Sequence, residues 1–178
     1  VRRNVDMTYV VMDNRIYGLT KGQASPTSRE DFETSTTPEG PQQPPVNPLA
    51  LAFAANGTFI AQSFSTDAQR HAQLVQEAIE HDGFGFVNVF SPCVTFNDVD
   101  TYEYFRGNLV DVADQGHDPT DYDAATSVIM DREQEYQGIL WQDEGSVSYH
   151  RQHGVTAPMV DIGTGAPDGA MDLVREFY

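Results

Sequence analysis

Short apolar runs separated by polar loops recur along the chain, with the lengths typical of strands in an α/β protein. Three runs bounded by turn residues predict strands over 7–12, 58–64 and 86–90. The first run is nearly continuous, which indicates a buried strand. A shorter run predicts a further strand over 139–141.

Apolar residues at helical spacing predict a helix over 66–81, which Thr66 and Gln69 begin as a capping box. Its predicted apolar face consists of Ala68, Ala72, Val75 and Ile79. Less regular patterns predict helices over 48–53, 101–109, 122–136 and 168–178. The order strand, helix, strand is typical of a parallel sheet with crossover helices, so we expect an α/β fold.

Length and composition fit a single domain over 1–178. Residues 24–47 are rich in Pro, Ser and Thr and predict an irregular excursion. Its length indicates a functional or a mobile segment. The chain has no initiator Met and starts with Val1, just before a strand, so we expect it to be the C-terminal part of a longer polypeptide.

Acidic residues outnumber basic ones by 27 to 10, and the formal charge is −17. The acidity is spread along the chain, which favours adaptation to a high-salt cytoplasm over an ordinary acidic protein. Without a basic patch the chain is not expected to bind nucleic acid. No apolar run approaches the roughly 20 residues of a membrane span, so we expect a cytoplasmic protein with no membrane contact.

The stretch DNRIYGLTKGQ, residues 13–23, follows the first strand and holds Lys21, the only lysine of the chain. Ligands bind at the carboxyl ends of strands in open α/β sheets. The side-chain oxygen of Asn14 and nearby carbonyls suit Mg²⁺ on a diphosphate, and Gly18 lets the backbone approach it. Cys93 follows the third strand and should lie at the same edge. A surface lysine and a buried structural cysteine remain the alternatives.

Two segments, DNRIYGLTKGQASPTS and FSPCVTFN, resemble the β subunit of 2-oxoacid:ferredoxin oxidoreductases, particularly the 2-oxoglutarate type. The similarity is close over 4–32 and 84–100. It implies a thiamine diphosphate-binding fold whose mostly parallel sheet carries helices on both faces. The strong acidity would make this a salt-adapted, haloarchaeal type.

The resemblance also implies a site. Mg²⁺ would take a side-chain oxygen of Asn14 and the backbone carbonyl of Ile16. The residues implied to line the cofactor are Asn14, Ile16, Tyr17, Gly18, Leu19 and Thr20. Leu19 and Lys21 would face the substrate, and Lys21 could pair with the distal carboxylate of a dicarboxylic 2-oxoacid. Cys93 matches the last of four cysteines that hold a 4Fe–4S cluster.

The implied reaction is the CoA-dependent oxidative decarboxylation of 2-oxoglutarate, with electrons passing through the cluster to ferredoxin. General acid–base groups would come from a partner α subunit, and none is assigned to this chain. Pyruvate as substrate, a non-redox thiamine enzyme and a non-catalytic scaffold are the alternatives. The Gly-Asp-Gly metal segment and three of the cysteines are absent from the sequence. By itself this chain should therefore bind neither the cofactor nor the cluster tightly.

Overall fold

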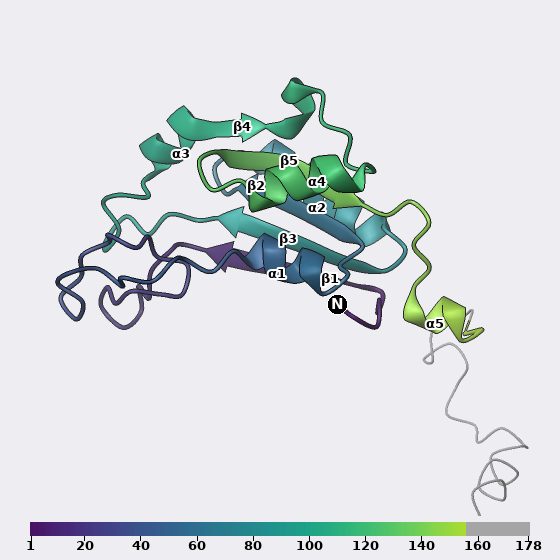
Figure 1. The fold of residues 1–178 in the computed structure, drawn as a ribbon, viewed down its shortest axis with the longest axis horizontal. Coiled ribbons are helices and arrows are strands. Elements are labelled where there is room, and N and C mark those ends of the chain that lie inside the picture. The colour runs from purple at the N-terminus through teal and green to yellow at the C-terminus, as the bar shows by residue number, and fades with distance from the viewer. Residues whose placement is uncertain (156–178) are drawn as a thin grey trace, which may run out of the picture.

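A five-stranded sheet forms the centre of the computed structural model, which describes residues 1–155 (Figure 1). The elements in chain order are β1 (Met7–Asp13), α1 (Pro48–Ala54), β2 (Phe59–Phe64), α2 (Ala68–Glu80), β3 (Phe84–Phe90), α3 (Tyr102–Asn108), β4 (Leu109–Asp111), the 3-10 helix η1 (Val112–Gln115), α4 (Tyr122–Met130), β5 (Glu135–Gln142) and α5 (Tyr149–Gln152). The helix predicted over 168–178 lies outside the described residues.

The strands lie in the order β1-β3-β2-β5-β4. β1, β3 and β2 run parallel, and so do β4 and β5, whereas β5 is antiparallel to β2. The prediction of a mostly parallel α/β sheet is therefore confirmed. Every predicted strand is present, and the strand predicted over 139–141 is longer at both ends.

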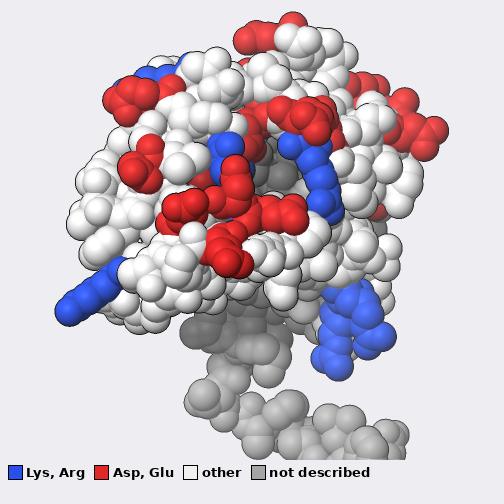
Figure 2. All heavy atoms as spheres, turned by 60° about the vertical axis from the view of Figure 1, so that its left-hand side comes forward, with Lys and Arg blue, Asp and Glu red and all other residues white. Residues whose placement is uncertain are grey.

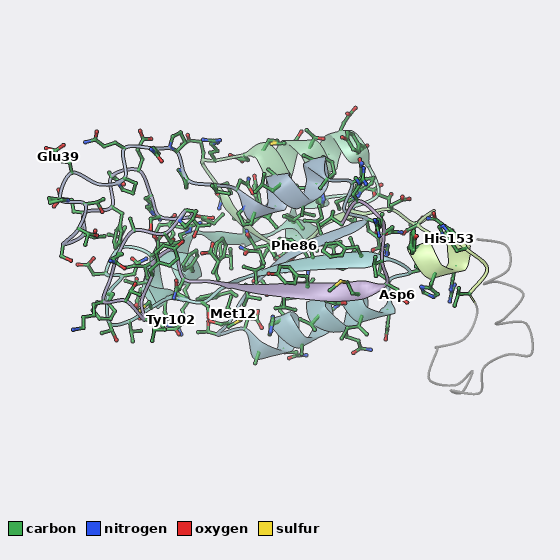
Figure 3. The ribbon with its side chains drawn as sticks, turned by 90° about the horizontal axis from the view of Figure 1, so that it is seen from below. Asp6, Met12, Glu39, Phe86, Tyr102 and His153 are labelled. Atoms are coloured by element: carbon green, nitrogen blue, oxygen red, sulfur yellow. The ribbon has the colours of Figure 1, made fainter. Side chains whose placement is uncertain are left out.

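Helices cover both faces of the sheet, as Figure 3 shows in the view along it. On one face α1 and α4 pack over the sheet through Phe53 and Ile129, against Ile60 and Phe86. On the other face α2 packs through Leu74 and other residues of a second cluster. Because alternate strand residues point to opposite faces, each buried strand contributes to both cores.

β1 lies at the edge of the sheet, and the expectation of a buried strand is wrong. Its side chains at Met7, Tyr9 and Met12 are exposed, and Figure 3 labels Met12 on this strand. Among residues 1–155, β1 pairs only with β3. The apolar run correctly indicated a strand but carried no information about which neighbours cover it.

Two helix boundaries differ from prediction. Asp67, not Thr66, caps α2, because its carboxylate accepts the N–H of Arg70 at 3.1 Å. Ile79 is exposed, so the buried stripe of α2 runs through Leu74 and Ala78 instead. α4 ends at Met130, well before the predicted end of that helix, and β5 takes up the residues from Glu135.

Residues 24–47 contain no helix or strand, as predicted. Phe32 is nevertheless buried, and the Val46 N–H donates to the carbonyl of Pro26, so the two ends of the segment meet. Within residues 1–155, no helix has the length and apolar character needed to cross a membrane.

Candidate functional site

The two segments singled out in the sequence lie side by side at the carboxyl edge of the sheet. Asp13 at the end of β1 is in register with Phe90 at the end of β3. The Ser91 N–H donates to the Asp13 carbonyl at 2.8 Å, so the pairing continues one step past the strand. The expectation that both segments share one edge is therefore confirmed.

Glycines bring these segments into contact. A Cβ at Gly18 would lie 3.1 Å from Cys93 Sγ. A Cβ at Gly22, whose φ is +84°, would lie 3.0 Å from the Phe96 ring. Asn97 adds a polar link, because its Nδ2 donates to the Asn14 carbonyl at 3.3 Å. A side chain at either glycine would push the two segments apart.

The two oxygens predicted to bind the metal belong to the Asn14 side chain and to the Ile16 carbonyl. Asn14 Oδ1 accepts the Ile16 N–H at 3.1 Å and so turns back over its own loop. The Ile16 side chain is buried, and its carbonyl accepts no hydrogen bond from within residues 1–155. An amide oxygen and a free carbonyl are hard oxygen donors of the kind Mg²⁺ takes. This pair fits a metal but provides only part of an octahedral shell.

The next turn presents its side chains outward. The Tyr17 N–H donates to the Gln23 carbonyl, and the Gly22 N–H donates to the Tyr17 carbonyl, which closes a tight loop. Thr20 Oγ1 donates to the same Tyr17 carbonyl at 3.4 Å. Leu19 is 100% exposed and Tyr17 is about half exposed. The structure thus fixes the backbone of this turn and leaves its side chains open to a ligand or a partner surface.

Lys21 has a φ of +77°, and its N–H donates to the Gly18 carbonyl at 3.2 Å. It borders a surface hollow of about 380 Å³ that residues 32–35 and 94–98 also line. No ion pair of Lys21 occurs within residues 1–155. Its ammonium group is therefore available to an incoming carboxylate.

Sequence reasoning missed a buried ionic network beneath the loop. Arg15 donates to Asp100 at 2.8 Å and to Glu135 at 2.7 Å, and Arg29 pairs with Asp100 at 2.7 Å. Burial lowers the pKa of Arg15, but the two carboxylates outweigh it and raise the pKa above its ordinary value. Arg15 is thus a permanent cation, and no spacing in the sequence pointed to its partners.

A pocket of about 540 Å³ opens beside this network, between the sheet edge and residues 24–47. Figure 2 shows acidic and basic side chains gathered around a hollow on this face, with acidic ones the more numerous. Its lining includes Asn88, which donates to Gln62, while Gln62 donates to the Tyr136 carbonyl at 2.6 Å. The lining combines these amides with charged side chains such as Arg15 and with apolar ones such as Leu140.

Cys93 is partly buried and unpaired. No group of three or more His, Cys, Asp or Glu side chains suited to a metal occurs in the described part of the chain. A 4Fe–4S cluster needs about four thiolates, and this chain has one cysteine. The residues present therefore do not form a cluster site by themselves.

Two family profiles match the chain. Residues 1–89 match "Thiamine pyrophosphate enzyme, C-terminal TPP binding domain", which contains β1 and the whole 13–23 loop. Residues 93–157 match the profile for the C-terminal region of the pyruvate ferredoxin oxidoreductase beta chain, and this match begins at Cys93. The first match ends at residue 89 and the second begins at residue 93, so the border between them lies at the end of β3, beside the 13–23 loop.

Curated relatives and a solved structure agree with these profiles. The chain is 41% identical over 104 residues to "2-oxoacid:ferredoxin oxidoreductase subunit beta" of Saccharolobus solfataricus, covering 58% of this chain and 34% of the relative. It is 40% identical over 98 residues to "2-oxoglutarate oxidoreductase subunit KorB" of Mycobacterium tuberculosis, covering 55% of this chain and 26% of the relative. The chain therefore spans about a third or less of these relatives.

Among solved structures, a 2-oxoglutarate:ferredoxin oxidoreductase from Magnetococcus marinus, with 2-oxoglutarate, coenzyme A and succinyl-CoA bound, superimposes with a TM-score of 0.82 at 35% identity. The superposition covers 98% of this chain and 59% of that chain.

Proposed function

The chain belongs to the thiamine pyrophosphate enzymes, as a part of their C-terminal TPP-binding domain, and we propose that it works in the β subunit of a 2-oxoacid:ferredoxin oxidoreductase. The observation that carries the proposal is the contact between the 13–23 loop and the Cys93 segment at one sheet edge. The two segments fall in two different family profiles, one of thiamine pyrophosphate enzymes in general and one of a ferredoxin oxidoreductase beta subunit, and this combination supports the proposed class.

The proposed reaction converts 2-oxoglutarate and CoA to succinyl-CoA and CO₂, the proton of the CoA thiol is released, and two ferredoxins each take one electron. It requires the partner α subunit, which would supply the acid–base groups. Thiamine diphosphate supplies an electron sink for the cleavage of the bond to the carboxylate. In this chain, the Asn14 side chain and the Ile16 carbonyl would hold the Mg²⁺ of its diphosphate. Tyr17 to Thr20 would line the cofactor and the substrate.

Cys93 has a narrower proposed role. We assign it as one of the thiolates of a 4Fe–4S cluster, with the others outside this chain. Support comes from its position against Gly18, where an added Cβ would lie 3.1 Å from its sulfur, so that Cys93 lies beside the 13–23 loop.

Substrate choice is proposed to depend on Lys21. A dicarboxylic 2-oxoacid carries a distal carboxylate that pyruvate lacks, and Lys21 lies exposed at the loop with its charge unpaired among the described residues. A charge-assisted hydrogen bond to that carboxylate is worth about 1.5–3 kcal/mol. Two of the similar relatives are named for 2-oxoglutarate, and this supports 2-oxoglutarate as the proposed substrate.

The test uses the complete α/β complex, purified without oxygen in molar KCl. CoA-dependent dye reduction is followed with 2-oxoglutarate and with pyruvate. We expect Lys21→Ala to raise KM for 2-oxoglutarate by about tenfold or more and to leave that for pyruvate nearly unchanged. Lys21→Arg, which keeps the charge, should retain most of the affinity.

Equal changes for both substrates would remove Lys21 from substrate recognition. A wild-type complex that prefers pyruvate would overturn the 2-oxoglutarate assignment but keep the enzyme class. Turnover without iron or ferredoxin would indicate a non-redox thiamine enzyme instead.

A further inference from the structure

The Arg15 side chain reaches from the start of the 13–23 loop into the body of the chain. Only 14% of this side chain is exposed. Its guanidinium donates to Asp100 at 2.8 Å and to Glu135 at 2.7 Å. The same group lies over the Phe90 ring, 4.9 Å from its centroid. Arg15 is thus anchored to three separate parts of the chain.

The backbone of Arg15 is equally constrained. Its φ of +54° lies in the left-handed region, which a non-glycine residue keeps only when its surroundings impose it. The Arg15 N–H donates to Asp13 Oδ1 at 2.9 Å, and its carbonyl accepts from Ser28 Oγ. Both peptide units that join Arg15 to Asn14 and Ile16 are therefore held in place.

A series of hydrogen bonds through Asp100 and Asn97 connects the Arg15 guanidinium to Asn14. Asp100 is bound by Arg15 and lies 3.4 Å from Asn97 Nδ2. That same Nδ2 lies 3.3 Å from the Asn14 carbonyl. The backbone N–H of Asp100 also donates to Asn97 Oδ1 at 2.8 Å. A shift of the Arg15 side chain would therefore displace the Asn14 backbone through these hydrogen bonds.

We propose that Arg15 is a positioning residue for the metal-binding oxygens of this loop. Its own side chain points to Asp100 and Glu135 and takes no part in binding the cofactor. It fixes the backbone between Asn14 and Ile16, whose oxygens flank it on both sides. This inference rests on the proposed function, because it assumes that these oxygens hold Mg²⁺.

The test measures Mg²⁺–thiamine diphosphate binding to the cofactor-stripped α/β complex by calorimetry, together with its Tm. We expect Arg15→Gln to weaken binding by about tenfold or more, as loss of a supporting group does at metal sites. The control is Arg106→Gln on α3, an exposed arginine with a 3.6 Å ion pair to Glu103, which should leave binding unchanged. Arg15→Gln combined with Glu135→Gln removes the unpaired carboxylate and should recover Tm without recovering binding.

A lowered Tm with unchanged cofactor affinity would show a purely structural role and overturn the proposal. If Arg15→Gln fails to fold, Ser28→Ala removes the hydroxyl that donates to the Arg15 carbonyl and accepts the Ser25 N–H, and it should weaken binding by a smaller factor. Unchanged binding in a folded Ser28→Ala complex would then overturn the proposal as well. Failure of the wild-type complex to bind the cofactor would instead refute the proposed function.

Discussion

β1 and β3 are neighbours with matched length, direction and register, yet their surroundings are opposite. Every residue of β3 is buried, whereas most of β1 is exposed. Val10 and Val87 show the contrast directly, because they are register partners with 39% and 0% exposure. The candidate site lies at the carboxyl end of this pair.

The contrast does not continue past the strand ends. The segment after β3 is itself exposed at Val94 and Phe96, although Asn97 and Asp100 are buried. Arg15 ties the loop after β1 to this segment through Asp100 and to the start of β5 through Glu135.

The strongest way to break the comparison is to remove Asp100, which is 2% exposed and pairs with both Arg15 and Arg29. Asp100→Ala leaves two arginines facing each other without their shared carboxylate. Breaking a buried ion pair from one side costs about 3–5 kcal/mol, so we expect the free energy of unfolding to fall by that amount. Urea unfolding measures it. Asp98→Ala, at an exposed position two residues earlier, is the control and should change stability by less than about 0.5 kcal/mol.

The register partners Val10 and Val87 test directly whether β1 is packed less well than β3. Val87→Ala deletes two buried methyl groups and leaves a cavity, which costs about 2–3 kcal/mol. Val10→Ala makes the same chemical change in a partly exposed side chain and should cost less than about 1 kcal/mol. Urea unfolding of both variants gives the difference. Equal losses would mean that β1 is as well packed as β3 and would contradict the contrast.

The smallest expected effect concerns the amino ends of these strands, where His81 precedes β3. Burial lowers the pKa of His81 below its ordinary value of 6.5, although Asp143, Asp82 and Asp6 oppose the shift. The unfolded chain therefore binds this proton more readily than the folded one. Stability is fully present above pH 6.5 and falls as the pH drops from 6.5 to the folded pKa.

The slope from one such group is at most about 1.4 kcal/mol per pH unit. Thermal unfolding between pH 5 and 7.5 measures it, and His81→Gln should flatten the profile in this range. An unchanged slope in that variant would assign the pH dependence to other groups.

Much of the fold could be predicted from local patterns. Apolar runs located each of the predicted strands, and the strand–helix–strand order gave the parallel arrangement of β1, β3 and β2. The edge position of β1 could not be predicted, because an exposed apolar strand and a buried one have the same composition. The end of α4 was missed because Asp131 turns the chain by accepting from Glu133 and Tyr136.

The site was predictable where it depends on strand ends. Parallel strands end at one edge, so the proximity of Gly18 and Cys93 followed from the topology. The role of Arg15 did not, because its carboxylate partners lie 85 and 120 residues further along the chain. Nothing local distinguishes an arginine that is to be buried from one that remains in solvent.

The open side of β1 has a consequence for handling the chain on its own. Among the described residues β1 has one unpaired edge, and such an edge with Met7, Tyr9 and Met12 exposed is a template for association between copies. The net charge of −17 opposes such contacts by mutual repulsion, which acts over about 10 Å at 0.1 M salt. In molar salt that range shrinks to about 3 Å, short enough for two edges to meet. Molar salt thus removes the repulsion that keeps β1 of one copy from joining β1 of a second copy.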